Sequence, residues 1–109
     1  MGQVAEKKLI TITSGSAGSD KIVLNQKTPG AILFPSAMSG SNLKFQVEVD
    51  GSYHDMYNRD GTLYQVPFIA NGFRSLEIVE FLNFLNLRVV SDATESSDRE
   101  FYIFSSNII

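Results

Sequence analysis

The sequence predicts an all-β protein: a single antiparallel β-sandwich, jelly-roll-like, with at most one short helical turn. The clearest observation is the strict alternation from Leu43 to Asp50, where apolar residues at odd positions are separated by polar ones. Successive side chains of a strand point to opposite faces, so this segment has one buried and one solvated face. Similar short stretches recur along the chain between turns rich in Gly, Ser, Asn and Asp. Seven or eight such strands are typical of a sandwich or jelly roll.

The chain is expected to begin with a flexible arm at residues 1–6, followed by one β-sandwich domain at residues 7–109. The strands predicted in the N-terminal third are short and lie at residues 7–14, 21–24 and 31–34. Small polar residues at 14–19 predict a mobile hairpin loop. Thr28-Pro29-Gly30 is expected to be a turn, because Pro and Gly interrupt regular structure.

The central stretch, residues 42–68, is predicted to form a three-stranded antiparallel meander. Its strands are the alternating segment followed by residues 53–57 and 63–68. Asp50-Gly51 supplies the positive φ angles that a tight hairpin demands, and residues 58–61 form the second turn.

The C-terminal third contains one ambiguous segment. Apolar residues between 78 and 85 have helical spacing, with Ser75 as a candidate N-cap, whereas residues 85–89 alternate as in a strand. We therefore expect a helical turn near 79–82 and then a strand at 84–90. Residues 91–99 carry acids and serines but no large apolar residue, which predicts an exposed loop before a last strand at 100–105.

Composition excludes several classes of function. The formal net charge is −3, and Lys and Arg are scattered, whereas nucleic-acid binding needs clustered cations facing phosphates. There is no cysteine, so neither a disulfide nor a thiolate metal site is expected. The N-terminus lacks the apolar core of a signal peptide, and no apolar run approaches the roughly 20 residues of a membrane helix. We expect a soluble protein made in a cytoplasm, without nucleic-acid or membrane partners.

The acidic central stretch does not predict a calcium site. Aligning the EF-hand glycine with Gly61 places Asn58 and Asp60 on ligand positions. The first ligand then falls on Met56 and the closing glutamate on Pro67, so the pattern fails. We expect no metal and no cofactor.

Catalytic constellations are also not predicted. His54 is the one histidine of the chain, which excludes any site built from two imidazoles, and no Gly-x-Ser-x-Gly elbow surrounds a serine. Asp50, Asp55 and Asp60 lie close together in sequence, but each belongs to a turn or to an exposed strand face. The chain is expected not to be an enzyme.

The tyrosines of the central stretch allow two interpretations. Tyr53, Tyr57 and Tyr64 fall on adjacent predicted strands, and a row of exposed aromatic rings is able to stack on sugars. Alternatively, the rings cover the rim of the core. With the apolar C-terminal pair Ile108 and Ile109, these three tyrosines are our candidate surface contacts.

The stretch from Asn42 to Val66 resembles small structural proteins of tailed bacteriophages. The shared pattern is an alternating strand, an Asp-Gly turn, a Tyr, a Met-Tyr pair, a second Asp-Gly turn and a Tyr-x-Val strand. The matching residues here are Leu43, Phe45, Val47, Asp50-Gly51, Tyr53, Met56-Tyr57, Asp60-Gly61, Tyr64 and Val66. A looser likeness extends over residues 31–104.

This resemblance implies a non-enzymatic virion protein that decorates or cements a capsid. Its partner would be the major capsid protein, and it would act as a homo-oligomer, with a trimer favoured, that bridges capsid subunits. The resemblance carries over no catalytic or cofactor residues. The alternative from a different class is a carbohydrate-binding module or a tail or neck adhesion component, which the tyrosines favour.

Overall fold

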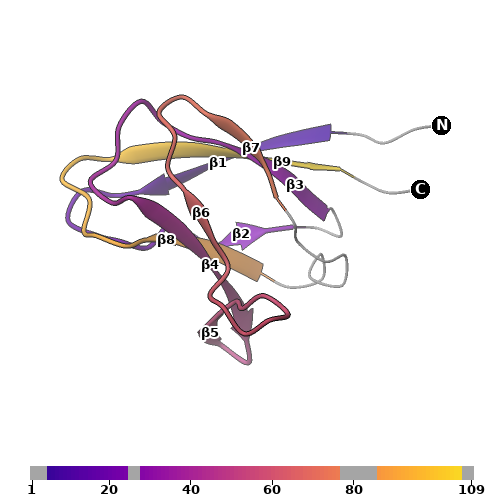
Figure 1. Ribbon diagram of the computed structural model, residues 1–109. Coiled ribbons are helices and arrows are strands. Elements are labelled where there is room, and N and C mark those ends of the chain that lie inside the picture. The colour runs from indigo at the N-terminus through magenta and orange to yellow at the C-terminus, as the bar shows by residue number, and fades with distance from the viewer. Residues whose placement is uncertain (1–4, 25–27, 77–85, 107–109) are drawn as a thin grey trace.

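The computed structural model describes residues 5–24, 28–76 and 86–106, and these form two antiparallel sheets packed face to face (Figure 1). One sheet has the order β1-β9-β3-β7, and the other has the order β2-β8-β4-β5, with β6 also paired to β4. The strands are β1 (Ala5–Ile12), β2 (Ile22–Val23), β3 (Thr28–Leu33), β4 (Asn42–Val49), β5 (Ser52–Asp55), β6 (Gln65–Pro67), β7 (Phe73–Ser75), β8 (Asn86–Ser91) and β9 (Arg99–Ser106).

The strand pairing is that of a long hairpin folded over on itself. β1 pairs with β9, β2 with β8, β3 with β7, and β4 with β5 and β6, so the tip of the hairpin is the β4–β5 turn. The described chain begins and ends side by side, because Ala5 pairs with Ser106. The predicted all-β, jelly-roll-like sandwich is thus confirmed, and none of the described residues is helical.

The core lies between the sheets and is built from alternate residues of each strand. In the central strand Leu43 and Phe45 are wholly buried, as the alternation predicted. Phe101 of β9 faces them from the other sheet and packs edge-on against Phe34. The buried cluster is completed by Ile10, Ile12, Ile22, Leu24, Ile32, Val66, Leu76, Leu87, Val89 and Ile103. Each fully buried aliphatic or aromatic side chain contributes about 1.5–3 kcal/mol, so this cluster stabilises the sandwich.

The predicted meander is wrong in its pairing. β5 pairs with residues 46–49 of β4, and β6 pairs with residues 42–44 of the same strand, so β5 and β6 follow one another along one edge. Between them residues 56–64 turn back as a small hairpin, closed by the Tyr57–Leu63 bridge. The Asp60-Gly61 turn closes this local hairpin. β4 has eight residues, which is long enough to pair with β5 and β6 one after the other.

Two turns predicted in the N-terminal third are also corrected. Residues 28–30 belong to β3, and the register slips between Pro29 and Ala31, where a bulge tolerates a residue without an N–H donor. Residues 14–19 do not close a hairpin, because β1 and β2 lie in different sheets. The segment instead crosses between the sheets, and Gly18 bridges to Val90 of β8.

Strand ends differ slightly from the expected ones. β1 begins at Ala5, so residues 5 and 6 of the expected arm lie in a strand, and β9 runs from Arg99 to Ser106. The last described strand before it is β8 (Asn86–Ser91), and residues 84 and 85 of the strand expected at 84–90 lie outside the described residues. The expected helical turn at 79–82 and the C-terminal pair Ile108 and Ile109 lie outside the described residues, whereas Ser75, the expected N-cap, lies in β7.

Candidate functional surfaces

The outer face of the five-stranded sheet is polar. Lys44, Gln46 and Glu48 alternate with the buried residues of β4, so they point away from the core. Asn86 and Arg88 of β8 share this face, because Glu48 pairs with Asn86 and Gln46 with Arg88. Tyr53 and Asp55 of β5 complete what we call the polar face.

One half of the polar face is a chain of hydrogen bonds across three strands. Lys44 Nζ lies 3.0 Å from Asp55 Oδ1, and Gln46 Nε2 donates to the same oxygen at 2.8 Å. Arg88 Nε donates to Gln46 Oε1 at 2.7 Å, and its guanidinium lies 4.2 Å from the centre of the Tyr53 ring. The hydrogen bond from Gln46 and the ammonium of Lys44 lower the pKa of Asp55. Its carboxylate therefore stays charged at neutral pH.

The other half of the polar face centres on Glu48. Asn86 Nδ2 donates to Glu48 Oε1 at 2.9 Å, and Lys21 Nζ lies 3.4 Å from the same oxygen. The hydrogen bond from Asn86 outweighs desolvation and, with Lys21, lowers the pKa of Glu48. General acid catalysis by a carboxyl group needs a raised pKa, so neither Glu48 nor Asp55 is suited to protonate a leaving group at neutral pH.

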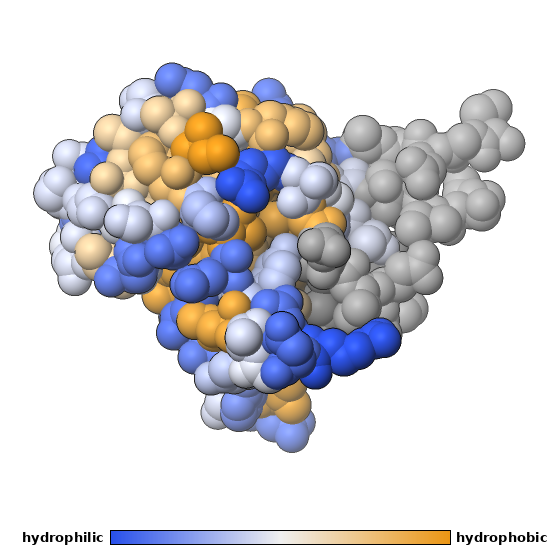
Figure 2. Space-filling model, in the orientation of Figure 1, coloured by the Kyte–Doolittle hydropathy of each residue, from blue (hydrophilic) through white to orange (hydrophobic). Residues whose placement is uncertain are grey.

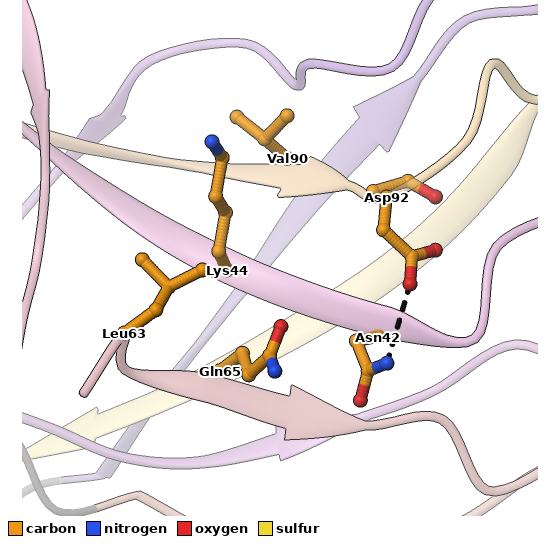
Figure 3. Close-up of a pocket in the computed structure, with 7 residues that line it drawn as sticks. Asn42, Lys44, Leu63, Gln65, Val90 and Asp92 are labelled. Carbon is orange, nitrogen blue, oxygen red and sulfur yellow. Dashed lines mark hydrogen bonds between the residues drawn. The ribbon is translucent and has the colours of Figure 1, made fainter.

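A shallow hollow of about 310 Å³ lies at one end of this face (Figure 3). Its lining residues come from β4, β6, β8 and the segments that follow or precede them: Asn42, Lys44, Leu63, Gln65, Val90, Ser91 and Asp92. Asp92 accepts from the backbone N–H of Ser41 and from Asn42 Nδ2, and the Lys44 ammonium is paired with Asp55. Because its charged groups are already paired within the chain, the hollow offers a small mixed polar and apolar surface rather than an activated group.

The outer face of the four-stranded sheet is apolar. One row across β1, β9, β3 and β7 consists of residues that pair in register: Leu9, Tyr102, Leu33 and Phe73. Leu9 is 51% exposed and Phe73 is 62% exposed. In the next row Phe104 lies against Phe73, with ring centres 5.1 Å apart. These five residues and Ala31 form what we call the apolar face. Figure 2 shows apolar atoms gathered over the upper part of the molecule, where β7 lies.

The apolar face was not anticipated, although the sequence carries a signal for it. In residues 101–104, Phe-Tyr-Ile-Phe, successive side chains are all large and apolar or aromatic, which is typical of a strand with both faces covered. Phe101 and Ile103 point into the core, so Tyr102 and Phe104 must point outward.

The candidate tyrosines do not form one row. Tyr53 lies beneath the Arg88 guanidinium on the polar face, and Tyr64 packs against the core with its ring 5.6 Å from that of Phe45. Tyr57 is 62% exposed on the hairpin of residues 56–64. His54 is an exposed residue of β5, paired with Val47. The face of stacked tyrosines that sugar binding would use is therefore not assembled, and one exposed ring remains.

The hairpin that carries Tyr57 is well ordered by its own hydrogen bonds. Asn58 N donates to Thr62 O at 2.7 Å, and Tyr64 N donates to Met56 O at 2.9 Å. Asp60 Oδ1 accepts from both the N–H and the hydroxyl of Thr62, and these two bonds lower the pKa of Asp60. The hairpin projects from the edge of the sheet beside β5 (Figure 1). It therefore presents Tyr57 on a preformed support.

Residues 91–99 were predicted to be an exposed loop, and this is wrong at Glu95, which is wholly buried. Its carboxylate accepts from the N–H groups of Ser39 and Gly40, from Ser91 Oγ and from Arg99 Nε. Burial by itself raises the pKa of Glu95, but these donors outweigh it and lower the pKa to about 2. The backbone of Glu95 also exchanges hydrogen bonds with Gly15 and Ser16. Glu95 thus ties three connecting segments together at one end of the sandwich.

Within the described ranges, no three His, Cys, Asp or Glu side chains gather as they would to hold a metal ion. The same part of the chain contains no helix with the length and apolarity needed to cross a bilayer. No family model matches the chain, and neither a curated protein nor a solved structure matches it.

Proposed function

We propose that this chain is a non-enzymatic virion protein that decorates or cements a bacteriophage capsid as a homo-oligomer. Its partner in this proposal is the major capsid protein, and its location is the virion after synthesis in the host cytoplasm. The observation that carries the proposal is the projecting hairpin of residues 56–64 with its exposed Tyr57. This hairpin lies within Asn42–Val66, the stretch that resembles small phage structural proteins.

Tyr57 fits a docking role because of its support. A large aromatic side chain held by a rigid backbone loses little conformational entropy on binding, and tyrosine is enriched at the centres of interfaces. The turn is held by Asp60 and Thr62, so the hairpin that carries the ring is ordered before contact. In contrast, the polar face beside it holds Asp55 and Glu48 in ion pairs and hydrogen bonds. A contact through the hairpin would leave those pairs undisturbed.

The proposal is tested by adding the pure protein to heads of the encoding phage that lack it. Co-sedimentation measures binding, and the temperature at which the heads open measures cementing. We expect wild type to bind and to raise that temperature, and Tyr57→Ala to weaken binding by about tenfold or more, as loss of an interface anchor does. Val23→Thr is the matched control, because Val23 is also exposed but lies on β2 at the opposite edge of the same sheet.

The same variants address the alternative function. A carbohydrate-binding module or an adhesion component of the tail or neck would also use the exposed Tyr57 ring, stacked on a sugar. A glycan array probed with wild type and Tyr57→Ala separates the two. Binding to a defined glycan that Tyr57→Ala abolishes, together with no binding to heads, would replace capsid decoration with carbohydrate binding.

A further inference from the structure

The two outer faces of the sandwich differ in kind. The polar face is crossed by hydrogen bonds and ion pairs from Lys44 to Arg88 and from Lys21 to Asn86. The apolar face has Leu9 and Phe73 about half exposed or more at its two edges, with Tyr102, Leu33 and Phe104 between them. A contiguous exposed apolar patch on a sheet marks an interaction surface, because removing apolar surface from water lowers the free energy.

The charges at the two ends of this face indicate what binds to it. Glu100 pairs with Thr11 and lies beyond one side of the Leu9–Tyr102 row, on the same outer face. Lys7 pairs with Phe104 and lies beyond the other side, with its ammonium 4.7 Å from the centre of the Tyr102 ring. The apolar row therefore has an acid on one side and a base on the other, along the direction of the strands.

This arrangement is complementary to itself. A two-fold axis along the row Leu9–Tyr102–Leu33–Phe73 lays each residue of the row over its own copy and reverses the strand direction. Lys7 of one copy then lies over the end of the other copy that carries Glu100, and the same contact is repeated by symmetry. Two sheets packed face to face lie about 10 Å apart, so the side chains of the two rows are in contact.

The sheet edges offer less for self-association. β1 and β7 are the edges of the four-stranded sheet, and β7 has three residues. β1 is longer but carries the consecutive cations Lys7 and Lys8, and lysines on an edge strand discourage pairing with another chain. The face is therefore the better surface for a second copy.

We propose that two copies of this chain associate through the apolar face, with a two-fold axis that pairs Lys7 of each copy with Glu100 of the other. The proposal deepens the homo-oligomer of the proposed function by naming its surface, and it replaces the favoured trimer with a dimer. The observations that support the dimer, and the experiment that tests it, involve this chain alone. The dimer can therefore be disproved while binding to heads is retained. A face four strands wide is small for an interface, so the dimer is expected to dissociate on dilution.

The mass of the pure protein is measured by sedimentation equilibrium over a wide range of concentration. We expect a monomer–dimer equilibrium for wild type. The double variant Leu9→Thr and Phe73→Thr should raise the dissociation constant by about tenfold or more. Each substitution removes apolar area from the interface, and the two-fold axis makes it do so twice. Val49→Thr, which changes an exposed valine at the end of β4 in the other sheet, should leave the dissociation constant unchanged.

Charge reversal tests the symmetry and does not depend on the apolar variants folding. Lys7→Glu and Glu100→Lys should each weaken the dimer by about fivefold or more, and the double variant should restore it. Restoration cannot come from within one chain, because Thr11, the partner of Glu100, is four residues or about 13 Å from Lys7 along β1. A monomer at all concentrations, a trimer, or single and double charge variants of equal affinity would overturn the proposal.

Discussion

The guanidinium Nε of Arg99 lies 2.8 Å from Oε1 of Glu95, a carboxylate without exposed surface. Glu95 Oε2 accepts from Ser91 Oγ at 2.7 Å and from the N–H of Gly40 at 3.1 Å. Both oxygens are thus supplied with donors, and a buried charge is tolerated when it is paired and hydrogen-bonded. Because the donors come from separate segments, Glu95 holds together connections that no strand pairing joins.

Replacing Glu95 with glutamine should strongly destabilise the fold. Glu95→Gln removes the charge that Arg99 faces and puts an amide N–H₂ group in place of an oxygen that accepts from the backbone N–H of Ser39 or Gly40. We expect the free energy of unfolding to fall by about 3–5 kcal/mol, as it does when one partner of a buried ion pair is removed. Asp20→Asn makes the same chemical change at an exposed position and should change the free energy of unfolding by less than about 0.5 kcal/mol. Denaturant melts compare the two variants, and equal midpoints would contradict the role of Glu95.

The acid sensitivity of the fold should come in part from the same group. The pKa of Glu95 is lowered in the folded protein from its ordinary value of 4.5 to about 2. The stabilisation is therefore fully present above pH 4.5 and is lost as the pH falls from there toward 2, by on the order of 3 kcal/mol. Urea melts across this range should show a steeper loss for wild type than for Glu95→Gln. Parallel curves would mean that the carboxylate is not held charged.

The register of β4 predicts a contrast between neighbouring positions. Phe45 is wholly buried, whereas Lys44 points to the outer face and its ammonium pairs with Asp55 on a partly exposed surface. Phe45→Ala should cost about 3–5 kcal/mol of unfolding free energy, because it removes a large side chain and leaves a cavity. Lys44→Ala should cost less than about 1 kcal/mol. Melts that gave both variants a similar small loss would show that the strand faces are misassigned.

Two glycines provide a matched test of close packing. A Cβ at Gly40 would collide with Ser91 Oγ, which donates to Glu95, and with Asp92 Oδ1, which accepts from the N–H of Ser41. A Cβ at Gly30 would meet no atom closer than the carbonyl oxygen of Phe104 at 3.9 Å. We expect Gly40→Ala to cost about 1–3 kcal/mol and Gly30→Ala less than about 0.5 kcal/mol in thermal or denaturant melts. The reverse order would show that the segment at Gly40 is free to move away.

Part of the candidate site could be predicted from the sequence. Tyr57 was expected to be a surface contact, and it is exposed, because the Asn58 to Gly61 turn places it on a short hairpin by local chemistry alone. Tyr64 belongs to the same pattern but packs on Phe45. That difference depends on where β6 pairs along β4, which residues near Tyr64 do not specify.

The fold class and the inward face of the main strands follow from the sequence alone. Alternation at Leu43 and Phe45 follows from backbone geometry, which sends successive side chains to opposite sides whatever the partner strand is. Strand pairing, in contrast, is a property of the folded chain, since one edge of β4 pairs with β5 and β6 in succession. The folded chain also buries Glu95 and places Leu9 and Phe73 on one face. Both results depend on groups brought from distant parts of the chain: the N–H groups of Ser39 and Gly40 that reach the carboxylate, and the two strands that lie between the two apolar side chains.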